Sequence, residues 1–192
     1  MNVPEIVTAD SKDLERVKGV LKLGFASDTL VRWVFPDAAN YLKSFDVWMK
    51  EFSKIAYEND VVYVEQNFAG ASIWHPPGAE FDEAALEPTF DAIPEDRLET
   101  VAKFFEEFDT YHPDDAWYLA FIAVDPSQQR KGIGSFLLKE ALDMIDQRGE
   151  RAYLEATSEQ NKALYERHGF VEIGKVQFED SPPAFPMIRE AR

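Results

Sequence analysis

Residues 117–134, WYLAFIAVDPSQQRKGIG, decide the fold of this chain. Residues 117–124 are apolar and of strand length, which predicts a buried central strand. A polar loop follows at 125–131, and from 132 to 148 apolar residues recur at helical spacing. A buried strand, a loop and an amphipathic helix in this order predict an α/β fold.

The flanking sequence extends this unit into a mixed central sheet flanked by helices. We expect helices at 38–57, 132–148 and 159–168, and another that starts from a cap at Asp10 or Ser11. Short β-rich runs predict strands at 5–9, 61–66, 71–75, 117–124, 152–156, 170–178 and 184–188. The region before the central strand is expected to be helical in pieces around 98–108. No internal repeat or long Gly/Ser-rich linker divides the chain, so we expect a single domain, 1–192.

The composition excludes several classes of function. The 192 residues include no cysteine, which excludes disulfides, thiolate metal sites and an acyl-cysteine intermediate. The three histidines lie far apart without HExxH-like spacing, so we expect no metal. No apolar run is long enough to cross a bilayer, and the N-terminus lacks a basic flank before an apolar stretch. We therefore expect no membrane partner and a cytoplasmic location.

The charge of the chain is negative and unevenly distributed. A formal net charge of −16 argues against nucleic-acid binding, which depends on Lys and Arg. Residues 80–115 hold thirteen acids and two bases, and so carry −11 of that charge. This acidic segment is either a solvated face or a rim that attracts a cationic substrate.

The helix start at Gly132 has features of a phosphate site. A helix N-terminus offers free N–H groups and the positive end of a dipole, and glycines let a phosphate approach closely. The P-loop pattern is absent, and the dinucleotide pattern would need glycine where Leu137 stands. On this fragment alone, phosphate binding and a helix start with small packing residues both remain open.

Two longer motifs resemble one known family. Residues 129–134, QRKGIG, resemble the Q/R-x-x-G-x-G/A signature of the GNAT acetyltransferases. Residues 161–170, NKALYERHGF, resemble that family's second block, N-x-x-x-x-Y-x-x-x-G-F, and stand in the right order. The puromycin N-acetyltransferase-like branch has similar features at Trp33, residues 72–78 (SIWHPPG), residues 116–126 (AWYLAFIAVDP) and residues 186–189 (PMIR).

The resemblance implies a GNAT fold with an acidic helical insertion before the central CoA-binding strand, and acetyl-CoA as co-substrate. It implies that backbone groups of Ile122, Ala123 and Val124 hold the pantetheine arm. The pyrophosphate would be held by the loop and first helical turn: Gln129, Arg130, Lys131, Gly132, Ile133, Gly134 and Ser135. By family position Asn161 contacts the CoA arm or, alternatively, bonds only to its own helix start.

The expected reaction is attack of a neutral amine on a thioester, which needs a base, a stabilised oxyanion and a proton for the departing thiolate. Tyr165 resembles the family tyrosine that supplies this proton, and its alternative is aromatic packing. The oxyanion donor is expected to be a backbone N–H near Val124.

Glu155 is the candidate general base, because a strand glutamate facing a cleft gains a raised pKa by burial. Its alternative is a pair with Arg151 or with a neighbouring residue. His75 and His112 are rival bases, each of which could instead be a plain surface histidine, and water could also carry the proton. His168 is expected at a helix end, where the dipole favours it.

The acceptor is the least defined part of the prediction. Four aromatic residues are either acceptor-pocket or core residues: Trp33, Phe35, Trp74 and Tyr111. The predicted function is direct ternary-complex transfer from acetyl-CoA to a small, cationic primary amine. A non-catalytic acyl-CoA sensor and a protein or peptide N-acetyltransferase remain alternatives. Dimers are common in the family, and a homodimer is compatible with this reading.

Overall fold

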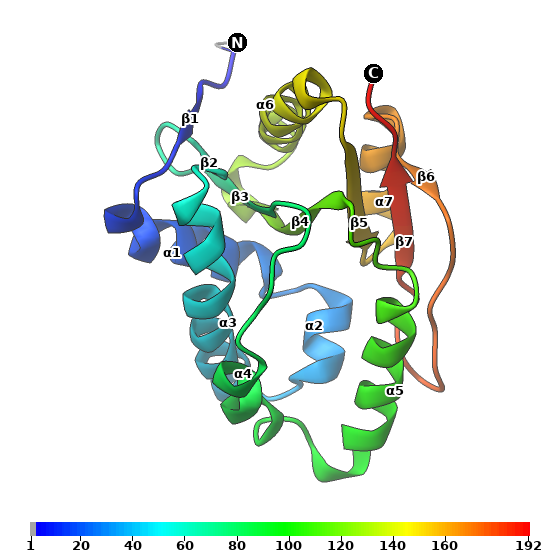
Figure 1. Cartoon of the computed structure of the whole chain (residues 1–192). Coiled ribbons are helices and arrows are strands. Elements are labelled where there is room, and N and C mark those ends of the chain that lie inside the picture. The colour runs from blue at the N-terminus through cyan, green and yellow to red at the C-terminus, as the bar shows by residue number, and fades with distance from the viewer. Residues whose placement is uncertain (1–2) are drawn as a thin grey trace.

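The computed structural model describes residues 3–192 and contains a mixed seven-stranded sheet in the order β1-β2-β3-β4-β5-β7-β6 (Figure 1). The strands are β1 Ile6–Thr8, β2 Val62–Glu65, β3 Gly70–His75, β4 Ala116–Val124, β5 Arg151–Ala156, β6 Val171–Glu172 and β7 Phe185–Arg189. Strands β4 and β5 are parallel, whereas the other neighbouring pairs are antiparallel. The predicted α/β architecture with a mixed sheet is confirmed.

Seven α-helices are described: α1 Leu14–Phe25, α2 Thr29–Val34, α3 Ala38–Glu58, α4 Glu83–Phe90, α5 Leu98–Asp109, α6 Ile133–Arg148 and α7 Glu159–Arg167. Helices α1 and α3 pack on one face of the sheet and α6 packs on the other (Figure 1). Within the described part of the chain, no helix has both the length and the apolar character needed to span a membrane.

Polar side chains start several of these helices. Asp28, Asp37 and Ser158 precede α2, α3 and α7, and each accepts a hydrogen bond from a backbone N–H in the first turn. Such caps satisfy N–H groups that a helix leaves without partners. Gly149 ends α6 with φ of +68°, a conformation that glycine adopts without strain.

One helix was missed, and one predicted strand is shorter than expected. The six-residue helix α2 was not expected, because it is too short to show a helical period. The expected strand at 170–178 is paired only at Val171–Glu172 and at an isolated bridge formed by Val176. Between them the backbone of Gly174 lies against the Tyr111 ring, where a side chain would not fit.

The feature that creates a site is the divergence of β4 from β5. These strands pair only between Ala116–Tyr118 and Arg151–Tyr153, although β4 continues to Val124. Its other edge stays bonded to β3, with a β-bulge that leaves Ala120 between the paired residues Leu119 and Phe121. Among residues 3–192, no strand pairs with the β5-facing edge of β4 beyond Tyr118.

Candidate active site

The gap between β4 and β5 opens into a cleft with a volume of about 1280 Å³. The residues predicted from the sequence that line this cleft are Ile122, Ala123, Val124, Gln129, Arg130, Gly132, Ile133, Gly134, Ser135, Glu155, Asn161 and Tyr165. Lys131 is not among the lining residues, and its ammonium donates to the Gln128 side chain at 2.6 Å. One cleft therefore brings together the strand edge, the glycine loop and both candidate catalytic residues.

The loop before α6 has the shape of an anion-binding site. Arg130 and Gly132 have φ of +63° and +84°, and Gly132 caps α6 without a side chain that could occupy its first N–H groups. Left-handed residues in a loop turn successive N–H groups toward one concavity. A Cβ at Gly134 would lie 3.8 Å from both Leu164 and Val124, so the cleft beside this residue is roomy. These features fit a pyrophosphate.

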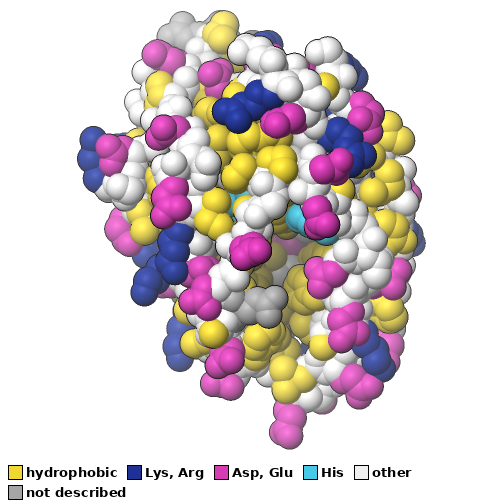
Figure 2. Space-filling view, in the orientation of Figure 1, with side chains coloured by type: hydrophobic (Ala, Val, Ile, Leu, Met, Phe, Trp, Pro, Cys, Tyr) yellow, Lys and Arg dark blue, Asp and Glu magenta, His cyan; other side chains and the backbone are white. Residues whose placement is uncertain are grey.

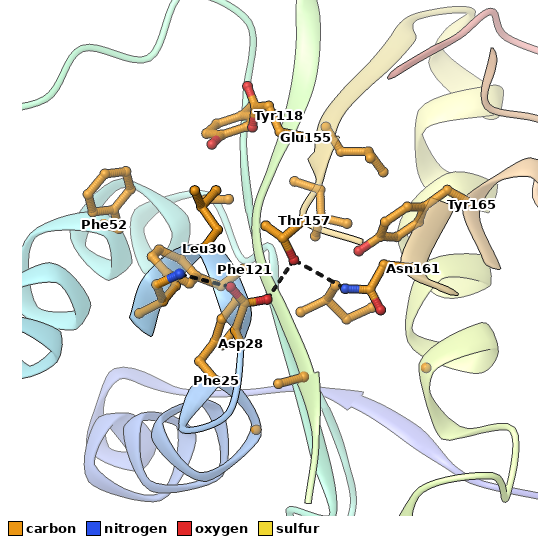
Figure 3. Close-up of a pocket in the computed structure, with 18 of the residues that line it drawn as sticks. Phe25, Asp28, Leu30, Phe52, Tyr118, Phe121, Glu155, Thr157, Asn161 and Tyr165 are labelled. Atoms are coloured by element: carbon orange, nitrogen blue, oxygen red, sulfur yellow. Dashed lines mark hydrogen bonds between the residues drawn. The ribbon is translucent and has the colours of Figure 1, made fainter. Parts of the chain in front are cut away.

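Asn161 belongs to a hydrogen-bonded network that crosses the cleft floor (Figure 3). Its side-chain amide donates to the Thr157 hydroxyl at 3.3 Å, and Thr157 donates to the Asp28 carboxylate at 2.6 Å. The backbone N–H of Asn161 also donates to Ser158. The network joins the α1–α2 junction to α7, and burial raises the pKa of Asp28. Sequence reasoning missed Asp28, whose pattern signals only a helix cap.

Glu155 has the environment of a general base. Its side chain is only 13% exposed, and burial raises its pKa to about 7, although the phenols of Tyr153 and Tyr118 act in the opposite direction. About half of the molecules then carry the carboxylate at neutral pH. Arg151 pairs instead with Asp115 and Glu190, so the alternative of an Arg151–Glu155 ion pair is wrong.

Tyr165 has the environment of a proton donor. It is buried on α7, and Figure 3 shows its hydroxyl directed from that helix toward the cleft. Burial raises its pKa, and the negative charges of Asp28 and Glu155 raise it further. The phenol is therefore protonated at neutral pH. Packing also contributes, because its ring lies edge-on to Phe170 at 6.0 Å.

The three histidines differ from one another. His75 is buried with a pKa lowered to about 4 by burial, and its Nε2–H donates to the Phe52 carbonyl at 2.7 Å, so the expected surface location is wrong. His112 lines the cleft with Nδ1 4.0 Å from the Glu155 carboxylate. His168 does end α7, but burial lowers its pKa and its Nε2 contacts the Ser135 hydroxyl at 3.0 Å.

The predicted acceptor-pocket aromatics lie elsewhere. Trp33, Phe35, Trp74 and Tyr111 do not line the cleft, and the first three are buried in the core. Its aromatic lining comes instead from Phe25, Trp48, Phe52, Phe81, Phe105, Phe108, Tyr118, Phe121 and Tyr165. Several of these lie on helices, where a sequence pattern cannot separate a cleft-facing aromatic from a core residue.

The sequence left open whether the acidic segment 80–115 is a solvated face or a rim around a substrate site, and its residues are found in both places. Glu80, Asp109 and Asp114 line the cleft, whereas acids such as Glu95 and Glu106 are exposed to solvent. Figure 2 shows acidic side chains around a hollow in which apolar side chains are visible.

Comparison with known proteins places this site in a family. Residues 96–172 match the family model of the acetyltransferase (GNAT) domain, a range that includes β4, α6, β5 and α7. An uncharacterized N-acetyltransferase of Schizosaccharomyces pombe is 30% identical over 125 residues, which are 55% of this chain and 48% of the relative. The match thus spans about half the length of that curated relative.

Solved structures share the fold over the full chain. A protein of Corynebacterium glutamicum, described as histone acetyltransferase HPA2 and related acetyltransferase, has a TM-score of 0.71 and 24% identity. The match covers 100% of this chain and 98% of that one. Arylalkylamine N-acetyltransferase 2 of Aedes aegypti has a TM-score of 0.68 and 13% identity, with 100% of both chains covered. The resemblance to the puromycin N-acetyltransferase-like branch stays a prediction. Residues 96–172 of this chain therefore carry a GNAT acetyltransferase domain.

Proposed function

We propose that this chain transfers an acetyl group from acetyl-CoA to a primary amine of a small molecule, directly within a ternary complex. One observation carries the proposal. A carboxylate with a pKa near neutrality and a protonated phenol line the same cleft as the open edge of β4. A base and an acid in one cleft are what aminolysis of a thioester needs.

The residues that would hold acetyl-CoA follow from the geometry. The open edge at Ile122–Val124 offers backbone groups to the amides of the pantetheine arm, as a neighbouring strand would. The N–H groups between Gln129 and Ser135 would hold the pyrophosphate, and Arg130, which lines the cleft, would add positive charge. Lys131 is held by Gln128 outside the lining, so we assign it a lesser part.

When bound, acetyl-CoA supplies the acetyl thioester, and the chain's own residues manage the protons and charge. Glu155 takes a proton from the acceptor ammonium, after which the new N–C bond forms and the C–S bond breaks. Tyr165 gives its proton to the departing sulfur and regains one as the acetylated nitrogen loses its second proton. A backbone N–H of β4 stabilises the oxygen that gains negative charge. The bulge at Ala120 is a second location for that donor, beside the one expected near Val124.

The test is release of CoA thiol from acetyl-CoA, followed colorimetrically with a panel of polyamines, aminoglycosides, puromycin and lysine peptides. The panel covers both peptide amines and small-molecule amines. Of the two solved structures named above, one is described as a histone acetyltransferase and the other as an arylalkylamine N-acetyltransferase. We expect amine-dependent release that falls in Tyr165→Phe. Release that is equal with and without every amine would contradict the proposal.

Two alternatives give different results in the same assay. A chain that only binds acyl-CoA would be stabilised by CoA in a melting experiment yet release no thiol. A peptide N-acetyltransferase would respond to lysine peptides alone. A cytoplasmic location and a homodimer accompany the proposal as predictions, to be checked by cell fractionation and by light scattering.

A further inference from the structure

The part of the cleft lined by α3, Phe81 and α5, here called the acceptor half, has two aromatic walls. On one side the rings of Phe52 in α3 and Phe81 lie 4.7 Å apart, and Phe52 also meets Phe121 of β4 at 5.5 Å. On the other side Phe105 and Phe108 of α5 lie 6.1 Å apart. Figure 1 shows α3 and α4 on one side of the molecule and α5 on the other. One wall therefore comes from α3 and the loop before α4, and the other comes from α5.

The space between these walls is suited to an apolar body. All five residues that α2 and α3 contribute to the lining are apolar: Leu30, Val31, Val34, Trp48 and Phe52. Phe105 keeps 39% of its surface exposed while lining a concave site. Apolar surface in such a site favours a ligand that removes it from water.

The charges of the lining favour a cationic head near Glu155 and an apolar body along α2 and α3. Among the described lining residues the bases are Arg130 and Arg167, from the loop and α7 that form the cofactor half. The lining acids are Asp28, Glu80, Asp109, Asp114 and Glu155, none of which lies within α2 or α3. Asp109 is close enough to Glu155 to raise its pKa. A second ammonium along the α2–α3 wall would meet no acid from either helix, because both contribute only apolar residues there. This wall therefore disfavours a polyamine.

We propose that the acceptor is a primary amine with one charge and a bulky apolar body, aromatic or branched aliphatic. The amine reaches Glu155, and the body lies between the Phe52–Phe81 wall and the Phe105–Phe108 wall. This inference rests on the proposed function and specifies the acceptor class of the same site.

The test compares kcat/KM for three probes: 2-phenylethylamine, ethylamine and spermidine. Because the first two differ by a phenyl group, the apolar walls should raise kcat/KM for 2-phenylethylamine over ethylamine by about tenfold or more. Spermidine should also have a lower kcat/KM than 2-phenylethylamine. In Phe105→Ala, loss of one ring contact should lower kcat/KM for 2-phenylethylamine by about fivefold and leave ethylamine nearly unchanged.

Phe90→Ala is the matched control, because Phe90 is 54% exposed and does not line the cleft. A preference for spermidine or ethylamine, or equal rates for Phe105→Ala and wild type, would overturn the inference while the acetyltransferase proposal stands. If none of the amines caused thiol release, the proposed function would be contradicted. Calorimetric binding of 2-phenylethylamine to the CoA-loaded chain, weakened in Phe105→Ala, would still support the apolar-amine site, and its absence would overturn that site too.

Discussion

Replacing Glu155 with Gln should abolish the pH dependence of the reaction and lower its rate. With a pKa of about 7, Glu155 is ionised in about 10% of molecules at pH 6 and about 90% at pH 8. The wild-type kcat/KM should therefore rise nearly tenfold over this range. Glu155→Gln should lower kcat/KM at pH 8 by about 10²-fold or more and flatten the profile, because the amide cannot take a proton.

The same substitution should make the protein more stable. Because the folded-state pKa of Glu155 lies above its ordinary value of 4.5, the folded chain binds more protons than the unfolded chain between pH 4.5 and 7. The free energy of unfolding therefore falls as pH rises through that window and levels off above it. The neutral amide avoids this cost, which is about 1 kcal/mol at pH 5 and about 3 kcal/mol at pH 8.

Urea unfolding at both pH values, paired with steady-state kinetics of thiol release, checks both expectations. Glu58→Gln is the control, because it makes the same chemical change at an exposed position near the end of α3. If Glu155→Gln kept a rate increase centred near pH 7, another group would be the base. If it were no more stable than wild type at pH 8, the assigned burial of the carboxylate would be wrong.

Substitutions at three other positions test separate parts of the site. Tyr165→Phe should lower kcat by about 10²-fold with the KM for acetyl-CoA nearly unchanged, since only the proton is removed; steady-state kinetics with varied acetyl-CoA measures both. Gly134→Ala should fold normally, because its new methyl group meets only ordinary contacts, but should weaken CoA binding about tenfold by calorimetry as the methyl group crowds the pyrophosphate. Asp28→Ala should destabilise the fold by about 1–2 kcal/mol through loss of the α2 cap and the Thr157 partner, and Asp28→Asn should recover part of this in urea unfolding.

The sheet and the cofactor half of the cleft were predictable because their signals are local. A long apolar strand followed by QRKGIG and an amphipathic helix fixes the neighbours of the glycine loop within a few residues. Glu155 and Tyr165 could be proposed for similar reasons, since each stands in or beside a motif. The structure adds properties that depend on the surroundings of a side chain, such as the burial that raises the pKa of Glu155.

The acceptor half could not be predicted, because it is assembled from residues distant in sequence. Phe52, Phe81 and Phe105 come from α3, a loop and α5, and nothing in a single sequence says that these segments share a cleft. Asp28 and Thr157 are 129 positions apart, so their hydrogen bond is visible only in three dimensions. Trp33 shows the converse, since it is buried away from the cleft and its indole donates to the exposed Asp180.

The short seam between β4 and β5 also has a consequence for the abundance of the folded chain. Three residue pairs join the β1–β4 half of the sheet to the β5–β7 half, and the remaining edge of β4 is left for a ligand. A ligand that occupies that edge only in the folded state adds about 2.7 kcal/mol of stability at a concentration 100 times its Kd. Resistance to unfolding and proteolysis would then follow the supply of acetyl-CoA, even in molecules that never meet an acceptor.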